Sequence, residues 1–119
     1  MALGNDPRKA LPLNPLTFHI LMVLLDQERH GYSIVKEVEK RTPDEFRIEP
    51  GNLYRTLRSM LQKGLIQECE ERPDPEMDDQ RRRYFQISKF GLQVARAETE
   101  RLECLLAEAR NYRILTQQT

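Results

Sequence analysis

Residues 50–87 constrain the fold of this chain most, because a helical pattern of apolar residues passes directly into a strand pattern. In the first half, apolar side chains recur at the three- and four-residue spacing of a helix with one buried face. These side chains are Leu53, Leu57, Met60 and Leu61. Gly64 follows, where helices commonly end in the left-handed conformation. Strand-like segments at 65–72 and 81–88 then flank the turn-rich run 73–80, so we predict a helix followed by a β-hairpin.

The opposite face of this helix is polar and carries arginines. It contains Asn52, Arg55, Arg58 and Ser59, with Tyr54 at its edge. The second hairpin strand opens with Arg81, Arg82 and Arg83. Such a helix beside a cationic hairpin suits a DNA groove and its neighbouring phosphates, so we predict a winged helix-turn-helix, mainly α with a small β-hairpin. The competing interpretations are a solvated helix face and the hydrophilic end of an edge strand.

The charge of the chain is neutral in total but uneven in distribution. The 19 acidic and 19 basic side chains cancel, whereas many DNA-binding domains are basic. Residues 47–63 nevertheless contain Arg47, Arg55, Arg58 and Lys63 against a single acidic residue, Glu49. The predicted hairpin tip, by contrast, is acidic. The neutral total and this tip favour an alternative, a winged-helix protein-interaction module that does not bind DNA.

Length and composition indicate one folded domain in the cytoplasm. The chain has 119 residues, of which 39% are hydrophobic and 32% charged, a balance typical of globular proteins. No apolar run approaches the roughly eighteen residues of a membrane span, and two cysteines are too few for a disulfide framework. Nucleophile elbows, glycine-rich phosphate loops and metal-ligand spacings are missing, so we predict no enzyme, no cofactor and no metal site.

The segments before residue 50 predict a loose arm, two helices and a short strand. Residues 1–13 have no clear periodicity. Asn14 and Pro15 are typical of a helix start, and this helix extends to about Gln27. A second helix is expected at 32–41, and a short strand that pairs with the hairpin at 46–48. Because the first helix is apolar nearly all round, we infer that something beyond this domain covers it.

The last helix, from Ser88 to about Arg113, carries an apolar seam at alternating spacings of four and three. The seam consists of Ala95, Thr99, Leu102, Leu106 and Ala109. A helix of about 37 Å overhangs a domain of this size, so we predict a homodimer. Its interface would bury the seam together with Leu16, Ile20 and Val23 of the first helix. The chain then divides into a flexible arm (1–13), a winged helix-turn-helix (14–87), and a dimerisation helix with its tail (88–119).

Five sequence blocks resemble, in order and spacing, the PadR family of bacterial transcription regulators. They are H-G-Y-S-I at 30–34, P-G-N-L-Y at 50–54, K-G-L-I at 63–66, R-R-R-Y-F-Q-I at 81–87 and S-K-F-G at 88–91. The short C-terminal part resembles the compact branch of that family, in which a single helix completes the dimer. The resemblance implies a homodimeric repressor that binds a pseudo-palindromic operator in double-stranded DNA.

The resemblance also implies which residues contact DNA. The recognition helix would use Asn52, Tyr54, Arg55, Arg58 and Ser59, and the wing would use Arg81 and Arg82. Lys36 and Lys40 would supply supporting phosphate contacts. Some members of the family bind flat hydrophobic compounds between aromatic side chains at the dimer centre. This chain has no Trp and offers Leu102 and Leu106 there, which leaves a small hydrophobic ligand at the dimer cleft as an open alternative.

Overall fold

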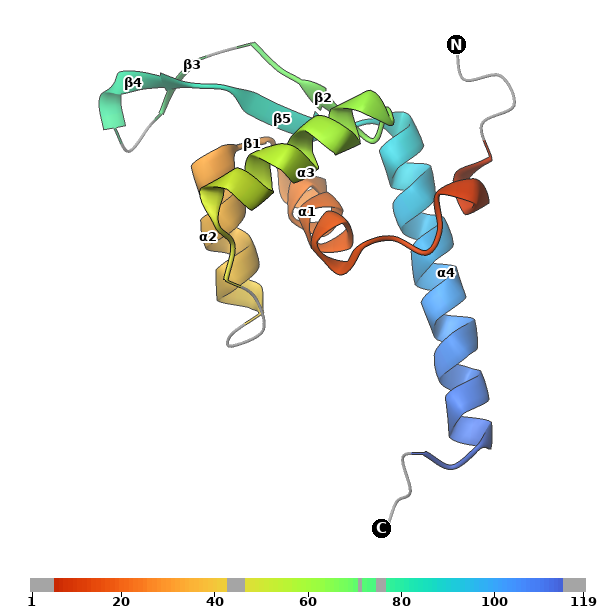
Figure 1. Ribbon diagram of the computed structural model, residues 1–119. Coiled ribbons are helices and arrows are strands. Elements are labelled where there is room, and N and C mark those ends of the chain that lie inside the picture. The colour runs from red at the N-terminus through yellow and green to blue at the C-terminus, as the bar shows by residue number, and fades with distance from the viewer. Residues whose placement is uncertain (1–5, 43–46, 71, 75–76, 115–119) are drawn as a thin grey trace.

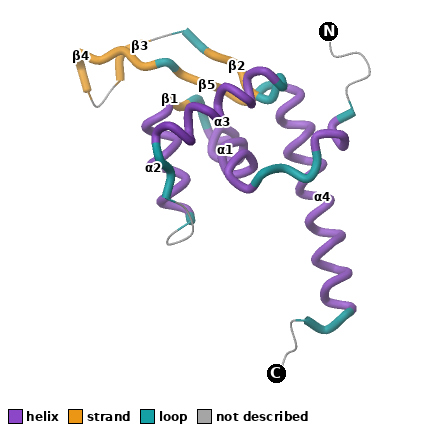
Figure 2. Tube along the Cα trace, viewed as in Figure 1, coloured by secondary structure: helices purple, strands orange, loops and turns teal. Residues whose placement is uncertain are grey.

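The computed structural model describes residues 6–42, 47–70, 72–74 and 77–114, with only the backbone described for 72–74 and 77–82. Helices α1 (Pro15–Asp26), α2 (Gly31–Arg41) and α3 (Pro50–Gln62) pack together beside a small sheet, as Figure 1 and Figure 2 show. The hairpin of β3 (Arg72–Asp74) and β4 (Met77–Arg82) projects from this body. Helix α4 (Lys89–Asn111) runs away from the body on the side opposite to the hairpin (Figure 1).

The sheet joins β1 (Arg29–His30), β5 (Tyr84–Ile87) and β2 (Ile66–Glu68) in that order, and both pairings are antiparallel. The predicted strand segments 65–72 and 81–88 contain β2 and β5, so their antiparallel pairing is confirmed, although each of these strands is shorter than its segment. The hairpin is longer than predicted, because the run 73–80 contributes residues to both β3 and β4 instead of forming one turn.

The third strand of the sheet lies elsewhere in the sequence than predicted. Arg47 and Ile48 are not in a strand, so the expectation of a strand at 46–48 was wrong for these two residues, and Phe46 lies outside the described part. The edge strand is instead the two-residue segment β1, in which His30 lies opposite Tyr84. A strand this short has no alternation that a sequence pattern could reveal.

The hydrophobic core forms around α1, which packs against α2, α3, α4 and β5 of the same chain. The prediction that something beyond this domain covers the first helix was wrong. Other elements of the same chain cover it, because α1 lies at the centre of the fold. The residues expected at a dimer interface, Leu16, Ile20 and Val23, are only 6%, 0% and 2% exposed in a single chain. They are core residues, so a partner could bury almost no further surface on them.

Helix α3 follows its sequence pattern closely. Leu53, Leu57 and Met60 are buried. The helix ends in a double hydrogen-bonded cap, in which Gly64 has a φ of 75°. The Gly64 N–H donates to the carbonyl of Leu61 at 3.1 Å, and the Leu65 N–H donates to that of Met60 at 2.9 Å. This turn sends the chain directly from α3 into β2.

The N-terminal segment, expected to be a loose arm, packs on α4 where the structure describes it. Pro7–Ala10 form a short 3-10 helix, η1, which contacts α4. The Leu13 N–H donates to the carboxylate of Glu98 at 3.2 Å. Glu98 is 2% exposed and also accepts two hydrogen bonds from the Arg101 guanidinium, at 2.6 and 3.0 Å. A buried acid in the middle of α4 therefore holds residue 13 against the helix.

Ser88, the predicted start of the last helix, is the N-cap of α4, and it fixes the helix to the end of α3. The Ser88 hydroxyl accepts from the Gly91 N–H at 2.9 Å and donates to the Gly64 carbonyl at 2.6 Å. A Cβ on Gly91 would lie 2.0 Å from the carbonyl oxygen of Leu65, so a larger residue would push the helix away from β2. The start of α4 is thus in close backbone contact with the winged-helix body.

Candidate nucleic-acid interface

The exposed face of α3 presents the polar side chains that the sequence assigned to it. Asn52, Arg55 and Arg58 are exposed, while the apolar residues on the other side contact the core. Neither arginine forms an ion pair with any residue that the structure describes. Both guanidinium groups are therefore available to a phosphate or to the edge of a base.

Tyr54 and Ser59 lie at opposite edges of this face. Tyr54 is 55% exposed, yet its hydroxyl lies against the start of α2, where a Cβ on Gly31 would be 3.1 Å from it. Ser59 is half-buried and lines a cavity that it shares with the N-terminal segment. The helix therefore presents Arg55 and Arg58 centrally, with Tyr54 toward α2 and Ser59 toward the N-terminal segment.

Lys36 and Lys40 are exposed on α2 and line an open hollow of about 740 Å3. The hollow lies between α2, β1 and Tyr84 at the base of the wing. The Lys36 ammonium is 5.3 Å from the centre of the Tyr32 ring, a cation–π distance that restrains the lysine. Glutamates line the same hollow, so its charge is mixed.

The start of α2 is capped by a residue whose role was missed from sequence. His30 lies outside the helix predicted at 32–41, whereas its Nδ1 accepts the Ser33 N–H at 3.1 Å and caps α2. The His30 ring meets the Tyr84 ring edge-on at 5.3 Å. His30 therefore links the start of α2 to the base of the wing.

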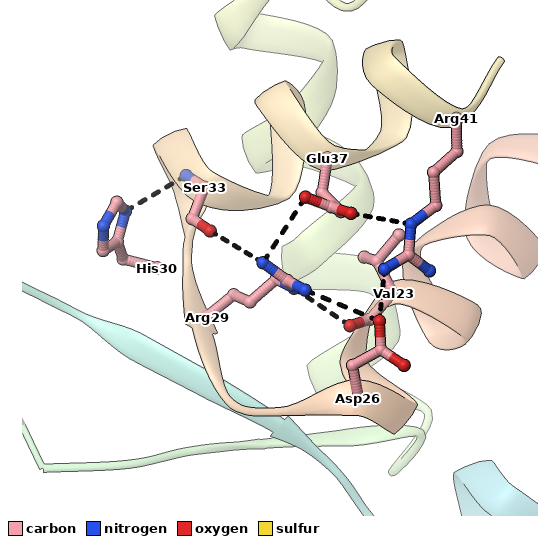
Figure 3. A network of polar contacts seen from close by, with 7 residues as sticks. All are labelled: Val23, Asp26, Arg29, His30, Ser33, Glu37 and Arg41. Carbon is pink, nitrogen blue, oxygen red and sulfur yellow. Dashed lines mark hydrogen bonds and ion pairs between the residues drawn. The ribbon is translucent and has the colours of Figure 1, made fainter.

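A buried arginine fixes α2 against α1 (Figure 3). The Arg29 side chain is 10% exposed, and its Nε donates to the carbonyl of Val23 at 3.0 Å. Its guanidinium also donates to the Ser33 hydroxyl at 3.2 Å and lies 3.6 and 3.8 Å from the carboxylates of Asp26 and Glu37. The group connects the end of α1 to the first two turns of α2.

The same two acids bind a second arginine at the far end of α2. Arg41 forms ion pairs with Asp26 and with Glu37, the latter at 2.7 Å (Figure 3). Hydrogen bonds from Arg41 lower the pKa of both carboxyl groups below their usual values. Both acids therefore stay ionised down to acidic pH and hold α2, which carries Lys36 and Lys40, against α1.

The wing places two of its arginines in β4. In the backbone register Arg82 lies opposite Arg72, and Arg81 lies opposite Pro73. The side chains of these residues lie outside the described part. Arg83, just after β4, is 65% exposed and pairs with Glu68 at 3.1 Å, so it ties β2 to the strand across from it.

Two further positions on α3 belong to the exposed face but were not assigned a role from sequence. Gln62 is exposed at the helix end, four residues after Arg58. Gly51 is exposed in the first turn, and a Cβ added there would meet nothing within 4 Å. The i, i+4 relation of Gly51 to Arg55 and of Arg58 to Gln62 is the signal that could have placed both on this face.

The distal part of α4 exposes an apolar stripe. Leu102, Leu105 and Leu106 are 37%, 51% and 44% exposed in the single chain. Ala95, the first residue of the predicted seam, is instead buried against the body, and the Thr99 hydroxyl donates to the Ala95 carbonyl at 2.9 Å. The seam therefore has a proximal part in the core of the chain and a distal part, with Ala109 half-buried, that extends beyond it.

The described residues form neither a cluster suited to a metal ion nor a helix suited to a membrane span. Histidine, cysteine, aspartate and glutamate side chains do not gather there in groups of three or more that could hold a metal ion. None of the helices described is long and apolar enough to cross a bilayer.

A three-helix body with a hairpin wing and a polar, arginine-bearing third helix defines the winged helix-turn-helix class. The sequence pattern of the transcriptional regulator PadR-like family matches residues 20–97, and the chain belongs to this family. Its members are transcription regulators, not enzymes; they bind DNA and are generally dimers.

Solved structures share this fold, and a curated sequence is similar over part of the chain. A PadR-like transcriptional regulator from Bacillus cereus superposes with a TM-score of 0.70 at 19% identity, covering 87% of this chain and 93% of its own. A PadR family regulator from Clostridium difficile gives a TM-score of 0.69 at 20% identity, covering 83% and 98%. A curated sequence from Lysinibacillus sphaericus, "Uncharacterized protein X", is 31% identical over 72 residues, which are 60% of this chain and 63% of the relative's length.

Proposed function

We propose that this chain is a dimeric, sequence-specific DNA-binding repressor that acts in the cytoplasm on a nearby operon or on its own gene. The observation that carries the proposal is the exposed α3 face, with Arg55 and Arg58 unpaired among the described residues and Leu53 and Leu57 anchoring the helix behind them. Such a helix fits the major groove, where an arginine distinguishes guanine by about 1–3 kcal/mol.

The neighbouring residues take supporting roles in this proposal. Asn52 and Tyr54 contact the DNA beside the two arginines, and Ser59 contacts it from the edge of α3. Lys36 and Lys40 on α2, and Arg81 and Arg82 on the wing, bind phosphates and set the register of the protein on the duplex. The exposure of Lys36 and Lys40 supports their part of this proposal.

The second chain of the dimer is proposed to pack along the distal seam of α4. Three exposed leucines, Leu102, Leu105 and Leu106, support this arrangement, because a monomer gains nothing from exposing them. A two-fold dimer requires a pseudo-palindromic operator with half-sites about one or two DNA turns apart. The cleft between the two α4 helices, lined by Leu102 and Leu106, would be the place for a small hydrophobic effector.

The decisive test is a salt-titrated binding assay on the DNA upstream of the protein's own gene, with a scrambled duplex as competitor. We expect the protein to prefer the upstream DNA over the scrambled duplex. The slope of log K against log salt concentration should be roughly −0.9 for each phosphate that the protein neutralises. The double variant Arg55→Ala/Arg58→Ala should lose at least about tenfold in affinity and stay dimeric. Arg96→Ala, which removes an exposed arginine from α4, is the matched control. Unchanged operator binding by the double variant would reject this interface.

A protein-interaction module is the second candidate, favoured by the equal numbers of acidic and basic side chains. In that case selection from random duplexes would return no preferred sequence. The same α3 variants would then abolish binding to a protein partner instead.

A further inference from the structure

A cavity of about 580 Å3 lies between the N-terminal segment, the first turn of α1, the end of α3 and the start of α4. Its walls include Lys9, Leu13, Ser59, Met60, Lys63 and Phe90. The volume is in the range of sites that hold small organic ligands. The cavity belongs to one chain, so it is separate from the cleft that two α4 helices would form.

The inner wall of the cavity is apolar and fixed. Met60 and Leu65 are 1% and 2% exposed, and Phe90 and Leu13 pack against the core as partly buried residues. The hydrogen bond from Leu13 to Glu98 and the contacts of η1 with α4 hold the N-terminal segment in place over this wall. A ligand entering here would meet a preformed apolar surface.

The polar part of the lining carries more positive charge than negative. Lys9 and Lys63 are both exposed and form no ion pair with a described residue. The acid in the lining, Asp6, is occupied: it accepts the Arg8 N–H at 3.0 Å and pairs with the Arg8 guanidinium at 3.2 Å. The hydroxyl groups of Ser59 and Thr17 add hydrogen-bonding capacity.

We propose that this cavity binds a small amphipathic anion, with its apolar body against Met60 and Phe90 and its anionic group at Lys9 and Lys63. The two features that carry the proposal are an apolar wall and two exposed ammonium groups that form no ion pair with a described residue, both in the lining of one cavity. Asp6 attracts Lys9 electrostatically, but its carboxylate is already paired with Arg8. The proposal does not depend on DNA binding. It does place the ligand in contact with α3 and α4 at once, at the end of α3 that holds Ser59.

The test compares two fluorescent probes on the full chain: anilinonaphthalene sulfonate, and N-phenylnaphthylamine, which has the same rings without the sulfonate. We expect one sulfonate site per chain and weaker binding of the neutral probe. The double variant Lys9→Gln/Lys63→Gln should weaken sulfonate binding by roughly tenfold and change neutral-probe binding by less than about twofold. Lys89→Gln/Arg96→Gln, which removes two exposed charges from α4 outside the cavity, should bind both probes like the parent.

Three outcomes would overturn the proposal. In the first, the parent binds both probes equally, so that the anionic group contributes nothing. In the second, the Lys89/Arg96 control loses as much sulfonate binding as the Lys9/Lys63 variant, which would indicate a general charge effect. In the third, Leu102→Glu/Leu106→Glu abolishes binding while the Lys9/Lys63 variant retains it, which would place the probe at the α4 seam.

Discussion

The hydroxyl of Tyr54 on α3 lies against Gly31 at the start of α2, so close that a Cβ on Gly31 would be 3.1 Å from it. The ring is otherwise 55% exposed on the proposed DNA-binding face. Because Gly31 has no side chain, the Tyr54 ring can lie in this position. The relation links the two helices of the helix-turn-helix.

This relation predicts that Gly31→Ala shifts Tyr54 and weakens operator binding while changing the free energy of unfolding by less than about 1 kcal/mol. The small stability effect follows because the alanine favours the helix as the partly exposed phenol moves aside. The measurement is a double-mutant cycle with Tyr54→Phe, which lacks the oxygen that the new methyl group meets. Equal losses from Gly31→Ala in the Tyr54 and Phe backgrounds would refute the link.

Gly51 predicts opposite signs for stability and binding. Because a Cβ there meets nothing within 4 Å, Gly51→Ala should stabilise the fold by about 0.4–1 kcal/mol. If DNA approaches the first turn of α3 closely, the same methyl group should clash with it and weaken operator binding. Thermal melting and operator titration measure the two effects, with Gln93→Ala on α4 as the control. Tighter operator binding by Gly51→Ala would show that DNA does not approach this turn.

Glu98 predicts a pH-dependent contribution to stability. Hydrogen bonds from Arg101, together with that from Leu13, lower the pKa of this carboxyl below its usual value. A lowered folded-state pKa means that the stabilisation is present above the unfolded value of about 4.3 and is lost as pH falls through the folded value. Glu98→Gln should thus reduce stability by about 1 kcal/mol at neutral pH and by less in acid.

Urea unfolding of Glu98→Gln at neutral pH and below about pH 4 measures this difference. Glu103→Gln, at an exposed position on the same helix, is the control and should change stability little at either pH. A Glu98→Gln deficit that stays constant with pH would mean that packing, and not the ionised carboxylate, accounts for the effect.

Arg29 is predicted to stabilise the α1–α2 pair. Arg29→Met keeps much of the side-chain volume but leaves the Val23 carbonyl unpaired and brings Asp26 and Glu37 together without the buried cation. The expected loss is about 1–3 kcal/mol in denaturant unfolding, because the guanidinium is buried while its acidic partners are partly hydrated. Arg96→Met, at an exposed position, should be nearly neutral. Equal stability of the two variants would contradict the role of Arg29.

The distal seam of α4 is predicted to determine the oligomeric state. Leu102→Glu/Leu106→Glu should give a folded monomer, because both positions are exposed in the single chain and the charges would be buried only against a partner. Sedimentation would measure the mass. Gln93→Glu/Asn111→Glu adds the same charge on the opposite side of the helix and should remain dimeric. A dimeric Leu102/Leu106 variant would place the interface elsewhere.

The parts of the fold that follow from local pattern could be predicted from sequence. The buried residues of α3, the left-handed Gly64 and the Ser88 cap each depend on residues within one or two helical turns. The same holds for the exposed arginines of the candidate site, since the apolar spacing fixes both faces of α3. These elements appear where their patterns place them.

The parts that depend on distant contacts could not be predicted in this way. Strand β1 is defined by its pairing with β5, more than fifty residues along the chain. The fixed position of the N-terminal segment depends on Glu98, 85 residues from Leu13. The apolar character of α1 was interpreted as a dimer surface because sequence does not show that α2, α3 and α4 surround it.

The anchoring of α4 at Gly91 and Glu98 makes this helix a lever. From Glu98 to Asn111 the helix is about 20 Å long, so a tilt of about 10° at the anchor moves its far end by about 3 Å. A small shift in the contacts at the anchor, among them the Leu13–Glu98 hydrogen bond, thus produces a larger displacement at the far end of α4. In a symmetric dimer both α4 helices would tilt together. A displacement of less than one atomic diameter at the anchor would then change the spacing between the two α3 helices.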